Sequence, residues 1–269
     1  MKRGLLILSL VLWLAARAWA VEIHPPHPWP GAPVLLKLPP QTTQVRFLGH
    51  VFYPFSFKGQ TLVLLAVPLG AKPGRYNAFI HGPKPQRIPI RIFPKRYPEE
   101  HLKVPPKMVK YPPPLLARIK REIRLIKATV ALSQPKVYLD GPFVWPVAGR
   151  LSSPFGLRRV YNGKPRSPHS GLDIACPEGT PVKAANRGKV ALVGDFYLPG
   201  KTVILDHGLG IYTVYAHLSK ILVKKGQWLE KGEVLALSGK TGRVTGPHLH
   251  FGCYIQGVKV DPQILLKIF

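Results

Sequence analysis

Two histidines lie two residues apart near the end of the chain, in the segment Gly246-Pro247-His248-Leu249-His250-Phe251-Gly252. Residues i and i+2 of a β-strand point to the same face, so the two imidazoles would lie about 6.5–7 Å apart at their backbones. Leu249 and Phe251 would then face the opposite side and pack into a core. Taken alone, the motif also fits a strand end whose histidines are solvated or hydrogen-bonded.

A histidine and a carboxylate lie four residues apart upstream, in Ser167-Pro168-His169-Ser170-Gly171-Leu172-Asp173-Ile174-Ala175. Its Pro, Ser and Gly argue against a helix, and its last four residues predict the start of a strand. Zinc binds imidazole and carboxylate groups, and catalytic zinc sites keep three protein ligands with a fourth position open. Residues 215–219 add another histidine after a strand-like run. These segments supply five candidate groups for a zinc site: His169, Asp173, His217, His248 and His250.

The spacing of these groups does not say which of them bind the metal. An H-x-H pair can place both imidazoles on one ion, and three expected ligands leave two histidines for a second role. Two imidazole nitrogens beside the attacking water could hydrogen-bond it and stabilise a tetrahedral intermediate. No glutamate stands next to a candidate histidine, unlike in H-E-x-x-H, so we expect an imidazole to be the base.

Residues 145–262 resemble the lysostaphin and LytM type of zinc metallopeptidase, which cuts peptide bonds in bacterial cell-wall peptidoglycan. The resemblance implies a duplicated hybrid motif fold and a Zn²⁺ ion bound by His169, Asp173 and His250. It also implies that His248 and His217 hold and polarise the attacking water and the developing oxyanion. Besides the histidine segments, the likeness covers residues 153–159, 179–184, 206–208, 226–227 and 241–247.

The first twenty residues predict a secretory signal. Lys2 and Arg3 precede an apolar run over residues 5–16, and Ala18-Trp19-Ala20 has the small-x-small pattern of a cleavage site. The run is shorter than the ~20 residues that span a bilayer. We therefore expect a mature chain that begins at Val21 and is exported to the periplasm, the cell envelope or the medium. A retained N-terminal anchor is the alternative.

The chain is strongly basic, with 39 Lys+Arg against 12 Asp+Glu. Without Lys2, Arg3 and Arg17, the mature chain keeps 36 − 12 = +24. Such a surface attracts anions, and an anionic wall polymer or membrane surface fits an exported protein better than nucleic acid. The alternative is that the charge only aids solubility.

Residues 21–97 predict a small immunoglobulin-like β-sandwich. Short apolar runs at 34–36, 44–47, 61–67 and 87–92 are separated by turn signals. The histidines of this half share no short spacing, so we assign them no metal. We expect the domain to position the enzyme or to shield its cleft, and no residue in it identifies a ligand.

Residues 98–140 predict a Pro-rich linker followed by an amphipathic helix over residues 115–132. Apolar side chains recur at three- and four-residue intervals and form one stripe. We expect the stripe to pack against a domain; binding to a membrane surface is the alternative. The stripe consists of Leu115, Ile119, Ile123, Ile126 and Val130.

Residues 141–269 predict a metallopeptidase domain built on one antiparallel, half-barrel-like sheet. Its strand-like runs lie at 188–194, 202–205, 211–215 and 233–237, with glycines between them. The pattern also resembles the biotinyl- and lipoyl-carrier half-barrel, but the chain lacks that carrier's Met-Lys-Met tip. The fold class is therefore mainly β throughout.

Several other residues of this domain receive weaker assignments. Cys176 and Cys253 each follow a proposed ligand by three residues, so they should face away from the metal, as a disulfide or as two buried thiols. Asp206 and His207 precede a glycine at a turn and are not assigned to catalysis. A rim loop that could bind a wall peptide is expected to carry Arg158, Arg159, Asn162, Lys164 and Arg166.

Together these features predict a secreted zinc endopeptidase that cuts stem or cross-link peptides of peptidoglycan. The alternative is a scaffold of the same fold that binds the wall or activates an amidase without activity of its own. The sequence identifies neither the bond that is cut nor a regulatory protein partner.

Overall fold

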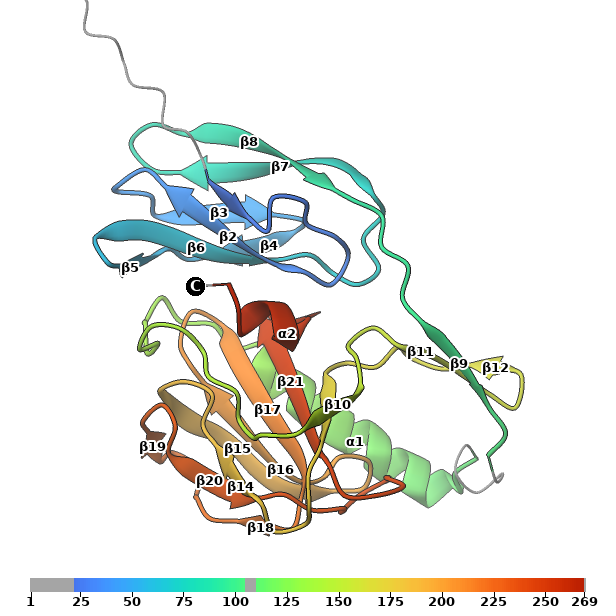
Figure 1. The fold of residues 1–269 in the computed structure, drawn as a ribbon. Helices are drawn as coiled ribbons and strands as arrows, with labels where there is room; N and C mark the ends of the chain where they lie inside the picture. The colour runs from blue at the N-terminus through green and yellow to red at the C-terminus, as the bar shows by residue number, and fades with distance from the viewer. Residues whose placement is uncertain (1–21, 105–109, 269) are drawn as a thin grey trace, which may run out of the picture.

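The computed structural model describes residues 22–104 and 110–268, which form two β-rich regions joined by an extended linker and one long helix (Figure 1). The predicted secretory signal and Pro105-Pro106 of the linker lie outside the described residues. Within the described ranges, no helix is both long and apolar enough to cross a membrane.

The first region is a sandwich of two four-stranded antiparallel sheets, which confirms the predicted mainly β fold of this half. One sheet has the order β1-β2-β6-β5, with β1 at Ile23–His24, β2 at Pro33–Leu38, β6 at Gln60–Ala66 and β5 at Phe55–Phe57. The other has the order β4-β3-β7-β8, with β4 at His50–Phe52, β3 at Gln44–Phe47, β7 at Gly74–His81 and β8 at Gln86–Ile92. The two-residue alternation is clearest in β8, where Ile88, Ile90 and Ile92 are buried between exposed residues.

The second region is built on one large antiparallel sheet with the order β10-β13-β21-β17-β16-β15-β19, and β22 pairs with β21. A small sheet, β14-β20-β18, packs beside it, and a short helix α2 (Pro262–Leu265) follows β22. Each run predicted as a strand here lies on one. The bounds are β10 Arg150–Ser153, β13 Leu172–Ala175, β14 Pro181–Lys183, β15 Gly188–Phe196, β16 Gly200–Asp206, β17 Ile211–Leu218, β18 Lys220–Ile221, β19 Trp228–Leu229, β20 Val234–Leu237, β21 Leu249–Ile255 and β22 Val258–Val260.

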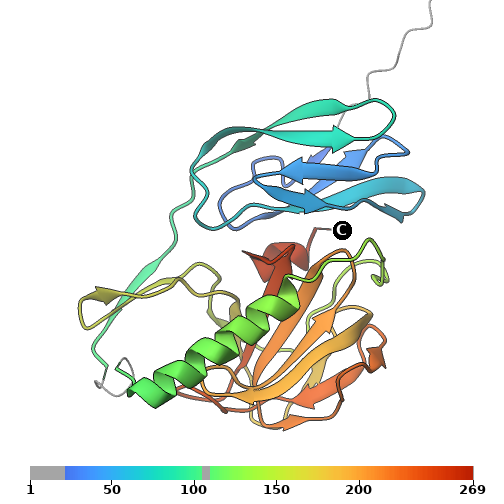
Figure 2. The same cartoon turned by 180° about the vertical axis from the view of Figure 1, so that it is seen from behind.

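The helix α1 (Pro113–Val130) lies across the back of the large sheet (Figure 2). It begins two residues before the predicted start, because proline is tolerated in the first turn of a helix. Ile119 and Val130 of the stripe are buried, and Val130 packs with Leu192 and Tyr212 of the sheet. The helix therefore packs against a domain, as expected, although Ile123 stays 41% exposed.

The expected rim loop is a β-hairpin that pairs with the linker. β11 (Arg158–Tyr161) pairs antiparallel with β12 (Lys164–Pro165) and parallel with β9 (Glu99–Leu102) of the linker. The Asn162 side chain makes two hydrogen bonds to the backbone of Val104: its Oδ1 accepts from the Val104 N–H, and its Nδ2 donates to the Val104 carbonyl oxygen. The assignment of a free loop was wrong, because its partner strand comes from a segment about sixty residues away that local patterning does not reveal.

The sandwich packs directly on the large sheet of the second region through β6, which contacts β21 and β22. The Asp261 backbone N–H donates to the Gly31 carbonyl oxygen at 2.8 Å. The Lys95 ammonium group lies 4.3 Å from the Trp29 ring centroid and 3.9 Å from the Asp261 carboxylate. Because these contacts combine apolar burial with directional polar bonds, they fix one region against the other.

Candidate metal centre

Three side chains from two segments converge on one point of the large sheet. His169 Nε2 lies 2.9 Å from Asp173 Oδ1, and His250 Nδ1 lies 2.8 Å from the same oxygen. The two imidazole nitrogens are 3.1 Å apart. One ligand atom from each residue lies within 4.8 Å of the others. The three residues that the family resemblance implied as ligands therefore lie side by side.

The pairing of β13 with β21 explains the convergence. Asp173 lies directly opposite His250 across these antiparallel strands, so both side chains point to the same face. Leu249 and Phe251 are fully buried on the other face, as the alternation predicted. Gly171 leaves the room for this arrangement, because a Cβ there would lie 2.9 Å from the His250 ring and 2.4 Å from a backbone oxygen.

His217 reaches the site only through an irregular backbone. Ala216 lies opposite His250, so regular alternation would turn the next side chain to the other face. A register shift in the β16–β17 pairing and a positive φ of 62° at His217 break that alternation. Its ring lies 4.8 Å from the His248 ring and 5.9 Å from the His250 ring, centroid to centroid. A positive φ in a non-glycine residue is strained, and such strain concentrates at functional sites.

Three of the four histidines use Nδ1 to fix the ring on a backbone carbonyl. His169 Nδ1 donates to the Pro154 oxygen at 2.8 Å, His217 Nδ1 to Thr241 at 2.9 Å, and His248 Nδ1 to Gly246 at 2.9 Å. Since Nδ1 carries the hydrogen in each ring, Nε2 is left as an acceptor. His248 Nε2 lies 3.7 Å from Asp173 Oδ1, so its acceptor nitrogen faces the cluster.

The protonation state of the cluster follows from burial and from the hydrogen bonds to Asp173. Burial opposes ionisation of Asp173, but the close approach of the His169 ring and the hydrogen bond from His250 outweigh it and hold the pKa of the carboxyl group well below its ordinary value. Burial lowers the pKa of His250, and burial together with the charge of His250 lowers the pKa of His217 to about 3. An ionised carboxylate at Asp173 and a neutral imidazole at His250 are the states that metal ligands require.

The donor set fits zinc. Two imidazole nitrogens and one carboxylate oxygen are ordinary zinc ligands, and bond lengths of ~2.0–2.1 Å place donors of a tetrahedron about 3.3 Å apart. The observed separations of 2.8–3.1 Å lie close to that spacing. The three side chains would therefore need only small shifts to hold the ion.

Behind the ligands lie Ser153, Arg159 and Glu100, of which sequence reasoning named only Arg159 and expected it on a rim loop that binds a wall peptide. Ser153 lies opposite Asp173 on β10, with Oγ 3.3 Å from His169 Nδ1. The Arg159 guanidinium donates to Ser153 Oγ at 2.9 Å and lies 3.8 Å from Asp173 Oδ2. Glu100 of the linker lies 3.5 Å from the same guanidinium. Ser153 and Arg159 belong to a motif of the resemblance, whereas no local signal marks Glu100.

Two residues that the sequence analysis set aside, Asp206 and His207, lie away from this cluster. Asp206 accepts from the Gly208 backbone N–H at 2.8 Å, which is the turn bond expected of it. His207 is fully buried and uses both ring nitrogens, on the Arg187 carbonyl at 2.8 Å and on the Thr213 hydroxyl at 2.7 Å. Cys176 and Cys253 are buried free thiols in the structure.

Comparison with known proteins identifies the family. Peptidase family M23 matches residues 167–262, which contain all five candidate groups. A crystal structure described as a peptidase M23 from Pseudomonas aeruginosa is 33% identical and superimposes with a TM-score of 0.73. The match covers 90% of this chain and 96% of that one, so it includes the sandwich. The chain belongs to peptidase family M23.

Curated relatives of this M23 chain match its C-terminal part. It is 46% identical over 113 residues to the peptidoglycan DD-endopeptidase ShyA of Vibrio cholerae serotype O1. Over the same length it is 42% identical to the DD-carboxypeptidase/endopeptidase Mpg of Neisseria meningitidis serogroup B. Each match covers 42% of this chain and 26% of the relative, so the M23 chain spans about a quarter of the length of these proteins.

Proposed function

We propose that this M23 chain is an exported zinc endopeptidase that hydrolyses stem or cross-link peptides of peptidoglycan. One observation carries the proposal: the ligand atoms of His169, Asp173 and His250 lie within 4.8 Å of one another, with the rings of His217 and His248 beside them. The names of ShyA and Mpg support peptidoglycan as the substrate class, and they favour a D,D linkage as the bond that is cut.

His169, Asp173 and His250 would hold the ion. A bound zinc ion supplies Lewis acidity, which polarises a carbonyl group and lowers the pKa of water. The bond from His169 Nδ1 to the Pro154 carbonyl turns Nε2 toward the site and fixes its tautomer. Ser153 and Arg159 hold His169 and Asp173 from behind, so the ligands are oriented before an ion arrives.

His217 and His248 would manage the proton and the oxyanion. Because Nδ1 of each ring donates to a backbone carbonyl, Nε2 is an acceptor that can take a proton from the attacking water. The imidazolium that results can donate a hydrogen bond to the developing oxyanion or return the proton to the leaving amine. Two such rings stand next to each other, so one can act as base while the other supports the oxyanion.

Digestion of purified peptidoglycan sacculi tests the proposal. We expect the zinc-loaded chain to release soluble muropeptides, a chelator to stop the release, and added zinc to restore it. Mass analysis of the products identifies the bond. Zinc binding without any release from sacculi or from soluble cross-linked muropeptides would instead support the non-catalytic scaffold. The presence of all five groups argues against that alternative.

Export is tested separately. The proposal expects a mature N-terminus at Val21, which mass spectrometry of the periplasmic or secreted protein would show. An intact Met1 in the exported fraction would contradict cleavage and favour the retained anchor.

A further inference from the structure

The β4-β3-β7-β8 sheet presents a basic outer face with no acidic residue. Between Glu22 and Glu99 the chain contains no Asp or Glu. Arg46 on β3, Arg75 on β7, and Arg87 and Arg91 on β8 are all exposed. None of the four forms an ion pair with a carboxylate in residues 22–104 and 110–268. Exposed charges without counter-charges create a local positive potential that is available to an anion.

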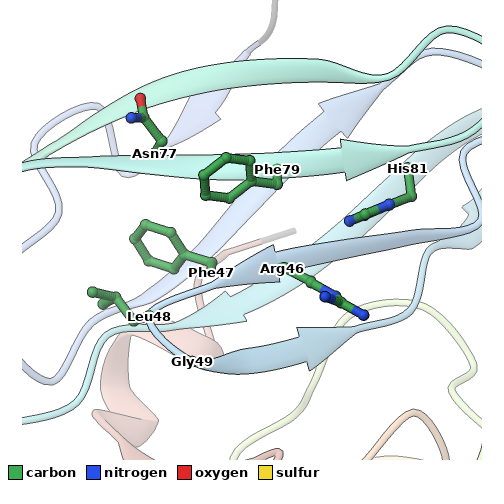
Figure 3. A pocket seen from close by; sticks show the side chains of 7 residues that line it. All are labelled: Arg46, Phe47, Leu48, Gly49, Asn77, Phe79 and His81. Atoms are coloured by element: carbon green, nitrogen blue, oxygen red, sulfur yellow. The ribbon is translucent and has the colours of Figure 1, made fainter.

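An aromatic ring lies in the middle of this face. Phe79 is 41% exposed, and the pairing of the strands places it directly between Arg46 and Arg87. The Arg87 guanidinium carbon lies 5.5 Å from the Phe79 ring centroid. Figure 3 shows the hollow that Phe79 and Arg46 share with Asn77 and His81, which lie on the same strand as Phe79. A flat apolar surface is thus flanked by two cations and an amide.

The face is turned away from the metal centre. The other sheet of the sandwich packs on the catalytic region through β6, and β7 and β8 lie farthest from that region in Figure 1. A ligand on the outer face would therefore not block the cleft.

We propose that this outer face is a second binding site, for glycan strands of peptidoglycan that carry carboxylate groups. One face of a sugar ring would stack on Phe79, and carboxylates would pair with the forked guanidinium groups of Arg46 and Arg87. Asn77 would bond a hydroxyl or an acetamido group. The inference rests on the proposed function for its choice of polymer, and its role would be to keep the enzyme on an insoluble substrate between cleavages.

Two other polyanions fit the face less well. An anionic bilayer takes up prominent apolar side chains, whereas Phe79 is more than half covered and lies in a hollow between charged groups. Single-stranded nucleic acid also combines stacking with basic residues, but it uses a groove with several aromatic rings in succession. The outer face has one exposed ring, which suits a single sugar.

Sedimentation with purified sacculi tests the site. The full chain would carry His248→Ala to prevent digestion, and binding would be measured with and without Arg46→Gln, Phe79→Ser and Arg87→Gln together. A matched control removes two exposed charges of α1 through Arg121→Gln and Arg124→Gln. We expect the first set to weaken binding at least tenfold and the control less than twofold. Conversion of the sacculus carboxylates to amides should weaken binding of the parent chain to a similar extent.

Several results would overturn the inference. One is an equal loss of sacculus binding for the outer-face substitutions and the α1 substitutions. Another is unchanged binding of the parent chain to amidated sacculi. The third is tighter binding of the parent chain to anionic vesicles or single-stranded DNA than to sacculi. Thermal unfolding shows whether the variants are folded. The three substitutions in the otherwise native chain should leave hydrolysis of a soluble cross-linked muropeptide unchanged. Loss of sacculus binding with unchanged soluble turnover supports the site, and binding without any turnover would refute only the proposed hydrolase.

Discussion

His207 and the histidines around Asp173 differ in how they use their ring nitrogens. Both ring nitrogens of His207 are hydrogen-bonded within the protein, one to the Arg187 carbonyl and the other to the Thr213 hydroxyl. In the cluster around Asp173, Nδ1 of His169, His217 and His248 bonds a backbone carbonyl, and Nε2 is left to face the site.

The difference separates a structural histidine from a functional one. Burial alone does not, because His207 and His217 are both buried and both have a lowered pKa. A histidine that uses both nitrogens has nothing left for an ion or a substrate. A histidine that uses one nitrogen for orientation keeps the other in a defined position, with the tautomer fixed. The predictions below test this distinction.

Loss of a ligand should have the largest effect. Asp173→Asn replaces the charged carboxylate ligand by a neutral amide, and His250→Ala removes an imidazole ligand, so for each we expect zinc to be lost on dialysis and hydrolysis to fall below detection. Metal analysis and sacculus digestion measure both quantities. His207→Gln is the control, and it should keep one zinc per chain. Retention of zinc by His250→Ala would remove this residue from the ligand set.

Substitution of the two neighbouring histidines should separate binding from turnover. His217→Ala and His248→Ala should retain zinc and lose about 10²–10⁴-fold in kcat, the usual range for a lost acid, base or oxyanion donor. Zinc content and kcat on a soluble muropeptide test this. A variant that loses zinc together with kcat would place that histidine among the ligands.

His207 should affect stability instead of activity. Burial lowers its pKa to about 4, against 6.5 for an ordinary histidine. Between these two pH values the unfolded state binds more protons than the folded state. The free energy of unfolding that neutral His207 contributes above pH 6.5 is therefore lost as the pH falls to about 4. The loss should reach about 3 kcal/mol. Urea unfolding at several pH values, compared with His207→Gln, isolates this contribution. Equal pH slopes for the two proteins would contradict it.

Substitutions in the pair formed by Arg159 and Glu100 should have the smallest effect, a reduced affinity for zinc. Arg159→Lys keeps a charge but loses the fork whose Nη2 reaches Ser153 and the Asp173 carboxylate while its Nε faces Glu100, so we expect zinc affinity to fall about tenfold. Competition with a chromophoric chelator measures the affinity. Glu100→Gln should have a weaker effect in the same direction. Arg158→Lys, one residue earlier, is the matched control and should leave the affinity unchanged.

The local parts of the structure could be predicted from the sequence. Alternating apolar residues indicated β13 and β21, because side chains alternate on every strand, and the same rule placed Leu249 and Phe251 in the core. The stripe on α1 predicted a packed helix for the same kind of reason. The hairpin at β11 and β12 was missed, since its pairing with β9 depends on a distant segment.

The sequence by itself determined which groups the chain offers: a histidine and an aspartate four residues apart, two histidines with one residue between them, and one more histidine after a strand. Tertiary structure decided how they are used. The pairing of Asp173 with His250 and the left-handed backbone of His217 depend on strand register. The bond from His217 Nδ1 to the Thr241 carbonyl and the approach of Glu100 to Arg159 also join residues far apart in the chain. Motif spacing describes only neighbours along the chain, whereas the chemistry depends on distances across strands.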